Sequence, residues 1–243
     1  MIAAPPTLGL VLAAAGSLVV LVTGQGTPAS AVVGFLTAAL LVLGFGVPVM
    51  APLSTFVFGA GILTRFGRRI KERSQAAEPN RGRRSASQVV AKLGLPALLG
   101  LAAALSRENE GPLAVATVAC LAGAFADTAA TEIGPIAGGA VVRWSGLRLV
   151  RASHGEVGGM SVAGLAGGAA ASWVLAAIAC LVGLLGTPAE AAVAAIAGFA
   201  ATGVESAVAA TPAGRRLGHG GRNVLVSILS AAIAAVFYRG GIR

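Results

Sequence analysis

Charged side chains are scarce in this chain: they make up 11% of its 243 residues, whereas a soluble domain carries about 25%. Hydrophobic residues make up 56%, in long runs where apolar and polar positions do not alternate. The scarcity of charge excludes an ordinary soluble domain, and the lack of alternation excludes a transmembrane β-barrel. The 35 glycines suit membrane helices that pack closely through small residues. We therefore predict one all-α domain, a polytopic bundle of transmembrane helices in a lipid bilayer.

Several catalytic signatures are also missing from the sequence. It contains no Gly-x-x-x-x-Gly-Lys-Ser/Thr phosphate-binding loop and no Gly-x-Ser-x-Gly nucleophile elbow. Cys120 and Cys180 lie inside apolar runs, so we interpret them as small buried residues rather than a disulfide or a metal pair. His154 and His219 lack the spacing of zinc ligands, and we expect both to be solvated loop residues.

The positive charge is unevenly distributed. The formal net charge is +9, and nine of the eighteen Lys and Arg residues fall between Arg65 and Lys92, with smaller clusters at 143–151 and 215–222. Aromatic residues make up only 5% of the chain, and Phe66 and Trp144 are the only ones within these clusters, which argues against nucleic-acid binding. The enrichment of basic residues on the cytoplasmic side of membrane spans explains the clusters better.

The apolar runs predict about eight spans, because a transmembrane helix needs roughly 17–25 residues. The spans are 7–23, 31–47, 48–64, 88–106, 112–132, 161–186, 189–209 and 223–238. The segment Gly44-Phe-Gly-Val-Pro48 is expected to divide the second span from the third. The alternative, a single span over 31–64 with a re-entrant piece, would move the N-terminus to the other side.

With eight spans, the loops 65–87, 133–160 and 210–222 share one side of the membrane. These loops contain fourteen of the eighteen basic residues, and Lys92 lies near the same end of its span. We therefore place them in the cytoplasm and both termini outside.

Two carboxylates, Asp127 and Glu132, lie at the end of a long apolar run. A charge at mid-bilayer costs about 2.5–3.5 kcal/mol or more, so intramembrane carboxylates usually mark a functional site. Asp127 shares a helix face with Thr131, and Thr128 shares one with Glu132. The two carboxylates are about 140° apart on an ideal helix, so they would flank a site unless the helix unwinds near Gly134-Pro135. The other interpretation is that both are solvated at the interface.

Glu205 and Asn223 also lie near the cytoplasmic ends of their spans, as does Lys92, so polar groups from four helices are expected to meet beside the basic loops. Carboxylates and hydroxyls suit Mg²⁺, which usually binds one or two carboxylates plus substrate phosphates. Nearby arginines would supply bidentate phosphate contacts. The glycine-rich run 155–159 could hold a phosphate in a nest of backbone N–H groups, or be only a flexible turn.

The sequence Ala-Asp-Thr-Ala-Ala-Thr-Glu-Ile-Gly at 126–134 resembles a motif of the integral-membrane family of unknown function that contains phytyl-phosphate kinase. Four weaker segments follow that family's order, at 88–94, 155–161, 203–206 and 223–227. The chain departs from the family pattern at several positions, so it is a divergent member and its nucleotide and alcohol substrate are left open. These departures are Lys92, Glu156, Glu205, Val224 and Ser227.

This resemblance implies phosphoryl transfer from a nucleoside triphosphate, with CTP favoured over ATP, to a phytyl- or geranylgeranyl-type isoprenyl monophosphate. We hypothesise that Asp127 and Glu132 bind Mg²⁺, with Glu205 as a third ligand or in the second coordination shell, and that Lys92 contributes to catalysis. Phosphate contacts would come from Arg84, Arg143, Arg151, Gly158, Gly159, Ser161 and Asn223, and Thr128 and Thr131 would support the carboxylates. A transporter of a small or anionic substrate, a CTP-using lipid cytidylyltransferase and a bundle without catalysis are the rival hypotheses, and a homo-oligomer is left open.

Overall fold

The computed structural model describes residues 5–74, 77, 82–106, 110–146 and 148–241. The long helices are α1 (Pro6–Val22), α2 (Pro28–Phe45), α3 (Met50–Arg65), α5 (Ala86–Leu105), α6 (Glu110–Ala137), α7 (Val162–Leu181), α8 (Pro188–Ala209) and α10 (Gly218–Gly241). The short elements are the 3-10 turn η1 (Val47–Val49), the helices α4 (Arg68–Arg73) and α9 (Pro212–Arg216), and the strands β1 (Val141–Ser145), β2 (Arg148–Ala152) and β3 (Met160–Ser161).

The predicted all-α polytopic bundle is confirmed. Within the described residues, seven helices are long and apolar enough to cross a membrane, and α1 is a shorter apolar helix of 17 residues. At 1.5 Å per residue α1 is about 25 Å long, slightly less than the roughly 30 Å of a bilayer's hydrocarbon core. Of the eight expected spans, α1 is therefore the marginal one.

The chain breaks between the second and third helices, as the glycines and proline predict. Helix α2 ends at Phe45, and Gly46 follows with a φ of 71°, a left-handed conformation that glycine adopts without steric cost. The turn η1 then leads directly into α3. The region 31–64 is thus a helical hairpin and not a single span.

Two helices extend beyond their predicted ends. Helix α6 was expected to stop at Glu132 or to unwind near Gly134, but it continues through Pro135 to Ala137. The missing N–H of a proline is tolerated where neighbouring helices support the backbone, and here Gly134 lies against the N-terminus of α7, next to Ser161. Helix α10 begins at Gly218, before the predicted start at residue 223.

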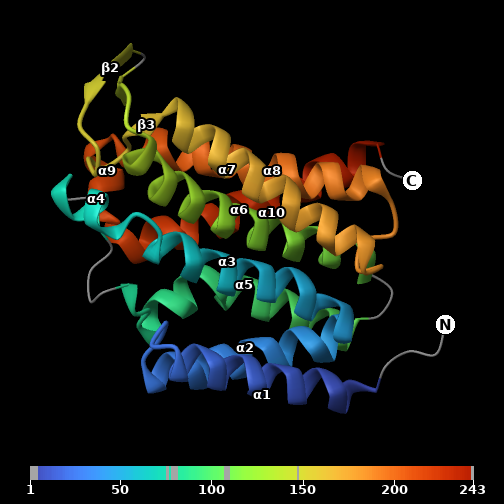
Figure 1. Cartoon of the computed structure of the whole chain (residues 1–243). Helices are drawn as coiled ribbons and strands as arrows, with labels where there is room; N and C mark the ends of the chain where they lie inside the picture. The colour runs from blue at the N-terminus through green and yellow to red at the C-terminus, as the bar shows by residue number, and fades with distance from the viewer. Residues whose placement is uncertain (1–4, 75–76, 78–81, 107–109, 147, 242–243) are drawn as a thin grey trace.

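A small antiparallel sheet, which the sequence did not lead us to expect, forms within the basic segment 133–160. Its strand order is β2-β1-β3, and β1 pairs with β2 from Val141 opposite Ala152 to Ser145 opposite Arg148. Figure 1 shows the β1–β2 hairpin projecting past the ends of the helices, beside α9. We predicted a loop here because the segment is rich in basic residues, and charge alone does not distinguish a loop from an exposed strand.

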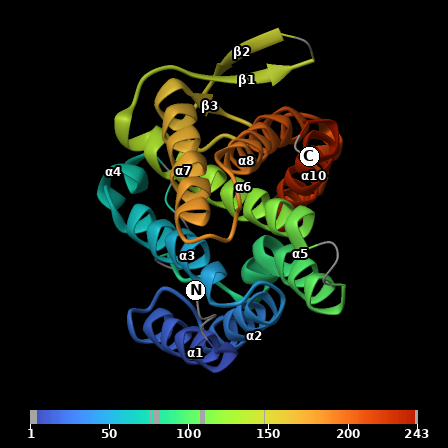
Figure 2. The ribbon, with the colours of Figure 1, turned by 90° about the vertical axis from the view of Figure 1, so that its right-hand side faces the viewer.

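Helix α6 is the centre of the bundle. It contacts α3, α5, α7, α8 and α10, which surround it in Figure 2, whereas α1 and α2 lie at the periphery. In its most apolar stretch, 83% of residues are buried, against 44% or less in the other candidate spans. Asp127 and Glu132, toward the C-terminal end of α6, are accordingly largely enclosed by protein, with side chains 20% and 6% exposed.

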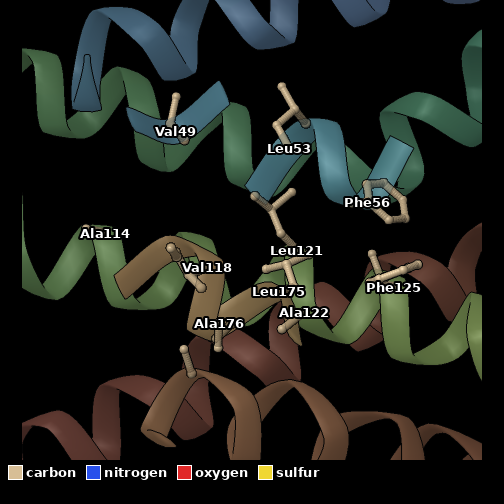
Figure 3. Packing of buried hydrophobic residues seen from close by; sticks show 14 of the residues in the cluster. Val49, Leu53, Phe56, Ala114, Val118, Leu121, Ala122, Phe125, Leu175 and Ala176 are labelled. Atoms are coloured by element: carbon tan, nitrogen blue, oxygen red, sulfur yellow. The ribbon is translucent and has the colours of Figure 1, made fainter. Parts of the chain in front are cut away.

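Small residues allow the neighbouring helices to approach α6 closely. A Cβ added to Gly198 of α8 would lie 2.6 Å from the backbone nitrogen of Gly123, and one added to Gly168 of α7 would lie 3.0 Å from the carbonyl oxygen of Ala126. On the α3 side larger apolar side chains fill the interface. Phe56 and Phe125 pack edge to face there, with their ring centroids 6.3 Å apart (Figure 3). Both cysteines are free, as expected.

The three predicted basic segments gather at one end of the bundle. Figure 1 shows α4, α9 and the sheet together at that end, and both chain termini at the opposite end. Because the described part of the chain crosses the bundle in eight long helices, an even number, it begins and ends at the same end of the bundle. Within the predicted basic loop 65–87, residues 75–76 and 78–81 lie outside the described residues.

The close contact at Gly198 gives the first testable prediction. Gly198→Ala should lower the free energy of unfolding by about 1–3 kcal/mol, because the added methyl group meets backbone atoms that cannot move aside. The control is Gly203→Ala on the same helix, where an added Cβ meets nothing within 4 Å. The control should be neutral or slightly stabilising, and thermal unfolding in detergent compares the two. Equal stability of the two variants would contradict the packing described here.

Candidate functional site

A polar cavity of about 300 Å³ lies at the end of the bundle that carries the basic segments. Its walls come from α5, α6, α7, α8 and α10 and from the loop that precedes α7. Most of the predicted site residues line it, namely Arg84, Lys92, Asp127, Thr128, Thr131, Glu132, Gly158, Gly159, Ser161, Glu205 and Asn223. The expected meeting of polar groups from four helices is therefore present in the fold.

Asp127 on α6 pairs with Lys92 on α5. The Lys92 Nζ atom lies 2.9 Å from the Asp127 carboxylate and 2.9 Å from the Thr128 hydroxyl, and its third contact is the carbonyl of Ala124 at 3.4 Å. These three acceptors match the three N–H donors of an ammonium group. Lys92 is thus anchored by the protein itself, and Thr128 positions the lysine rather than a carboxylate.

The start of α5 explains why Lys92 reaches α6. Ser85 caps the helix by accepting a hydrogen bond from the backbone N–H of Gln88, and the Gln88 side chain accepts one from the N–H of Ser85. This capping box fixes the first turn of α5. Lys92 follows one turn after Gln88, on the side that faces α6.

Glu132 is held by a residue that the sequence did not identify as part of the site. Lys71 of α4 folds back into the bundle, where its Nζ lies 2.5 Å from the Glu132 carboxylate and also donates to the carbonyls of Leu63 and Thr64. The side chains of Lys71 and Glu132 are only 1% and 6% exposed. Glu132 therefore neutralises a buried lysine, and this contact argues against the predicted role as a Mg²⁺ ligand.

On the opposite wall, Glu205 of α8 faces Arg222 and Asn223 of α10. The Arg222 Nε lies 3.3 Å from the Glu205 carboxylate. Asn223 is 5% exposed, and its Nδ2 donates to no group among the described residues although it lines the cavity. A buried amide without a partner is costly, so its N–H groups are available to a ligand. Arg222 was not predicted as a site residue, although it precedes Asn223 directly.

The two histidines are closer to the site than expected. Both His154 and His219 line the polar cavity. His154 lies in a turn of the loop, as predicted, whereas His219 is exposed but belongs to α10. The loop assignment of His219 was wrong because the predicted start of α10 lay after it.

The glycine-rich loop packs against α8, and two of its N–H groups have partners within the loop. Gly158 has a φ of 76°, and a Cβ there would lie 2.8 Å from the carbonyl oxygen of Ser206. The N–H groups of Glu156 and Gly159 already donate to carbonyls within the loop. The Ser161 hydroxyl accepts from the backbone N–H of Gly164 and caps α7. These groups shape the cavity wall, and their internal bonds argue against phosphate binding by this loop.

Thr131 and Arg143 also have other partners, and Arg151 lies away from the cavity. The Thr131 hydroxyl donates to carbonyls of its own helix. Arg143 pairs with Glu156 at 2.6 Å, and Arg151 is exposed on the β1–β2 hairpin, so neither arginine lines the cavity. The Ser153 N–H and then Arg143 lower the pKa of Glu156 below its ordinary value, which keeps the pair ionised at neutral pH.

The predicted set of three metal-binding carboxylates does not assemble. Among the residues that the structure describes, no three His, Cys, Asp or Glu side chains are placed to hold one metal ion. Asp127 and Glu205 do line the same cavity. Mg²⁺ commonly takes one or two carboxylates and completes its octahedron with substrate phosphates and water. The site therefore fits Mg²⁺ when a phosphate supplies the remaining ligands.

A second cavity, of about 130 Å³ and mostly apolar, lies between α1, α2, α3 and α5. It shares Arg84, Lys92 and Thr128 with the polar cavity, so the two cavities adjoin at these residues. The geometry thus combines ion-pairing groups at the end of the bundle with a hydrocarbon-lined space inside it.

These features define a polytopic integral membrane protein with a polar cavity at one end of its helical bundle. The chain belongs to the integral membrane protein family DUF92, whose model matches residues 7–224. This match confirms the family that the motif at 126–134 predicted. No protein of curated function and no solved structure matches the chain.

The Lys71–Glu132 pair leads to a stability prediction. Lys71→Met leaves a buried carboxylate without its partner, which should lower the free energy of unfolding by about 3–5 kcal/mol. Adding Glu132→Leu should restore most of the loss, because an apolar pair of similar volume is often as stable as a buried ion pair. Thermal unfolding of the two variants in detergent tests this. Arg68→Met, which removes an exposed pair with Glu72, is the control and should change stability by less than about 1 kcal/mol.

Proposed function

We propose that this protein is a kinase that transfers a phosphoryl group from a nucleoside triphosphate, with CTP favoured over ATP, to a long-chain isoprenyl monophosphate. The observation that carries the proposal is the junction of the two cavities at Arg84, Lys92 and Thr128. The polar cavity offers ion-pairing groups to phosphates, and the apolar cavity offers contacts to a hydrocarbon tail. A phytyl- or geranylgeranyl-type phosphate combines both parts, and the motif resemblance supports the same class of substrate.

The position of the polar cavity favours an enzyme over a transporter. All its lining residues come from the end of the bundle that carries the basic segments. Transport sites usually lie near the bilayer midplane, where access can alternate between the two sides. A site at one end, beside loops rich in arginine, is better placed to take a nucleotide from one compartment.

The proposed reaction needs positioning and charge neutralisation more than acid–base chemistry. An oxygen of the isoprenyl phosphate attacks the γ-phosphorus, a new phosphoanhydride bond forms, and the bond to the β-phosphate oxygen breaks to release CDP. The attacking oxygen is already ionised, so no general base is required. This agrees with the geometry, since Lys92 holds Asp127 in an ion pair. Phosphoryl transfer proceeds mainly through positioning and electrostatic stabilisation.

The charges of the cavity indicate why a cation would be needed. Two carboxylates of the lining, Glu132 and Glu156, are paired with Lys71 and Arg143, which lie outside the lining. The other two, Asp127 and Glu205, face the cavity and would repel a triphosphate unless Mg²⁺ accompanies it. In the proposal Asp127 and Glu205 hold Mg²⁺ together with phosphate oxygens, and the ion neutralises charge on the transferring group. Arg84, Arg222 and the Asn223 amide contact the phosphates.

The proposed orientation places the basic segments and the polar cavity in the cytoplasm, with both termini outside. The concentration of Lys and Arg at that end supports it, and nucleoside triphosphates are available on that side.

Kinase activity can be measured with purified protein in detergent, supplied with geranylgeranyl monophosphate, Mg²⁺ and CTP. The wild type should form geranylgeranyl diphosphate and CDP, and Asp127→Asn should reduce the rate roughly a hundredfold or more, the usual cost of losing a major electrostatic contact. Glu110→Gln, at the far end of the same helix and exposed, is the matched control and should retain full activity.

The products separate the rival hypotheses. Pyrophosphate together with a cytidylated lipid would indicate a cytidylyltransferase instead. No product from folded protein with either CTP or ATP would contradict the kinase and favour transport.

Asn223 gives a prediction in which stability and activity move in opposite directions. Asn223→Leu removes a buried amide that lacks a donor contact, so the variant should be as stable as the wild type or more stable. It should nevertheless lose activity, because the amide can no longer contact a phosphate. Thermal unfolding and the CDP assay measure the two effects on the same sample. A variant that is less stable but fully active would contradict this role.

A further inference from the structure

The apolar cavity extends from the polar site into the bundle. At the basic end its walls include Gln25, Ser30, Gly61 and Gln88, and at the inner end they include Ala13, Ala38, Met50 and Leu53. The wall on α2 runs from Ser30 to Ala38, and at 1.5 Å per residue this corresponds to a depth of about 12 Å. The cavity is therefore elongated along the helix axes, like an extended hydrocarbon chain.

The mouth of this cavity is held in place by backbone contacts. The N–H of Arg84 donates to the carbonyl of Gln25 at 2.8 Å, and the N–H of Thr27 donates to the carbonyl of Arg84 at 3.1 Å. The Arg65 guanidinium also donates to the carbonyl of Thr23 at 2.6 Å. These bonds tie the basic segment to the turn between α1 and α2, so Arg84 stays where the two cavities meet.

Two glycines keep the middle of the cavity open. Gly16 of α1 and Gly34 of α2 both line it, and a Cβ added to either residue meets nothing within 4 Å. Other glycines in the bundle, such as Gly44 and Gly198, are needed for close backbone contacts. Gly16 and Gly34 have no such contact, so their lack of a side chain leaves space rather than allowing helices to approach.

We propose that this cavity binds the isoprenoid tail of the substrate, with the phosphate at Arg84 and the tail directed past Gly16 and Gly34 toward Met50 and Leu53. This inference rests on the proposed kinase function for the identity of the head group. The two cavities adjoin at Arg84, Lys92 and Thr128, and this indicates the occupant, because the two spaces together match one molecule with a charged head and an apolar tail. The glycine pair then determines whether a long tail fits.

The test measures dissociation constants of geranylgeranyl monophosphate and of Mg²⁺-CTP for detergent-purified protein. Gly34→Leu should weaken geranylgeranyl monophosphate binding roughly tenfold or more, in line with the effect of one misfitting group in an apolar pocket. Binding of Mg²⁺-CTP should stay unchanged. Gly203→Leu is the matched control, since its added Cβ also meets nothing within 4 Å and it lines neither cavity. The control should bind both ligands like the wild type.

The outcomes distinguish the tail site from the kinase. Unchanged lipid affinity in Gly34→Leu, or no lipid binding by the wild type, would overturn the tail site even if the kinase assay succeeds. Lipid binding that Gly34→Leu weakens, without any diphosphate formed by the wild type, would support the tail site and contradict the kinase.

A second measurement avoids dependence on a variant's folding. Geranylgeranyl monophosphate with a photoreactive group at the tail end should label wild-type peptides that contain Ala38, Met50 or Leu53. Labelling confined to exposed residues such as Val236 and Phe237, which are 71% and 55% exposed, would overturn the tail site.

Discussion

Lys71 donates to Glu132 and Lys92 donates to Asp127, and these two ion pairs join α4 and α5 to the central helix α6. Lys71 and Lys92 are the only lysines of the chain, and both are buried. Each carboxylate would be costly inside the bundle without its partner. The pairs therefore fix the position of the basic segment 65–87 against the bundle. Of their members, Lys92, Asp127 and Glu132 also form part of the wall of the polar cavity.

This constraint divides the carboxylates of the motif between two roles. Glu132 is almost fully enclosed with Lys71, so its contribution is to the structure of the cavity wall. Asp127 is the more accessible of the two, with 20% of its side chain exposed, and it faces Glu205 across the same cavity. A motif that looks like one metal site in the sequence thus contains one structural carboxylate and one that a ligand can reach. The Asn223 amide adds a donor on the opposite wall.

Much of the fold could be predicted because the hydrophobic effect and bilayer thickness act on composition and length. The hairpin at Gly46 and the meeting of Asp127, Glu205 and Asn223 follow from turn chemistry and span parity. Lys71 could not be found this way, because in sequence it is one basic residue among many in a polar loop. Its burial depends on α4 folding back onto α6, which is a tertiary contact. The β1–β2 hairpin and the position of His219 were missed because local charge hid the strands and the true start of α10.

The most direct measurement of the proposed chemistry follows the γ-phosphoryl group of CTP. Radioactive phosphorus at the γ-position, with geranylgeranyl monophosphate and Mg²⁺ in detergent, should enter the lipid fraction in an amount equal to the CDP released. The same label at the α-position should remain in the aqueous fraction. If the γ-label stays aqueous with folded protein, or if the α-label enters the lipid, phosphoryl transfer is not the reaction of this site.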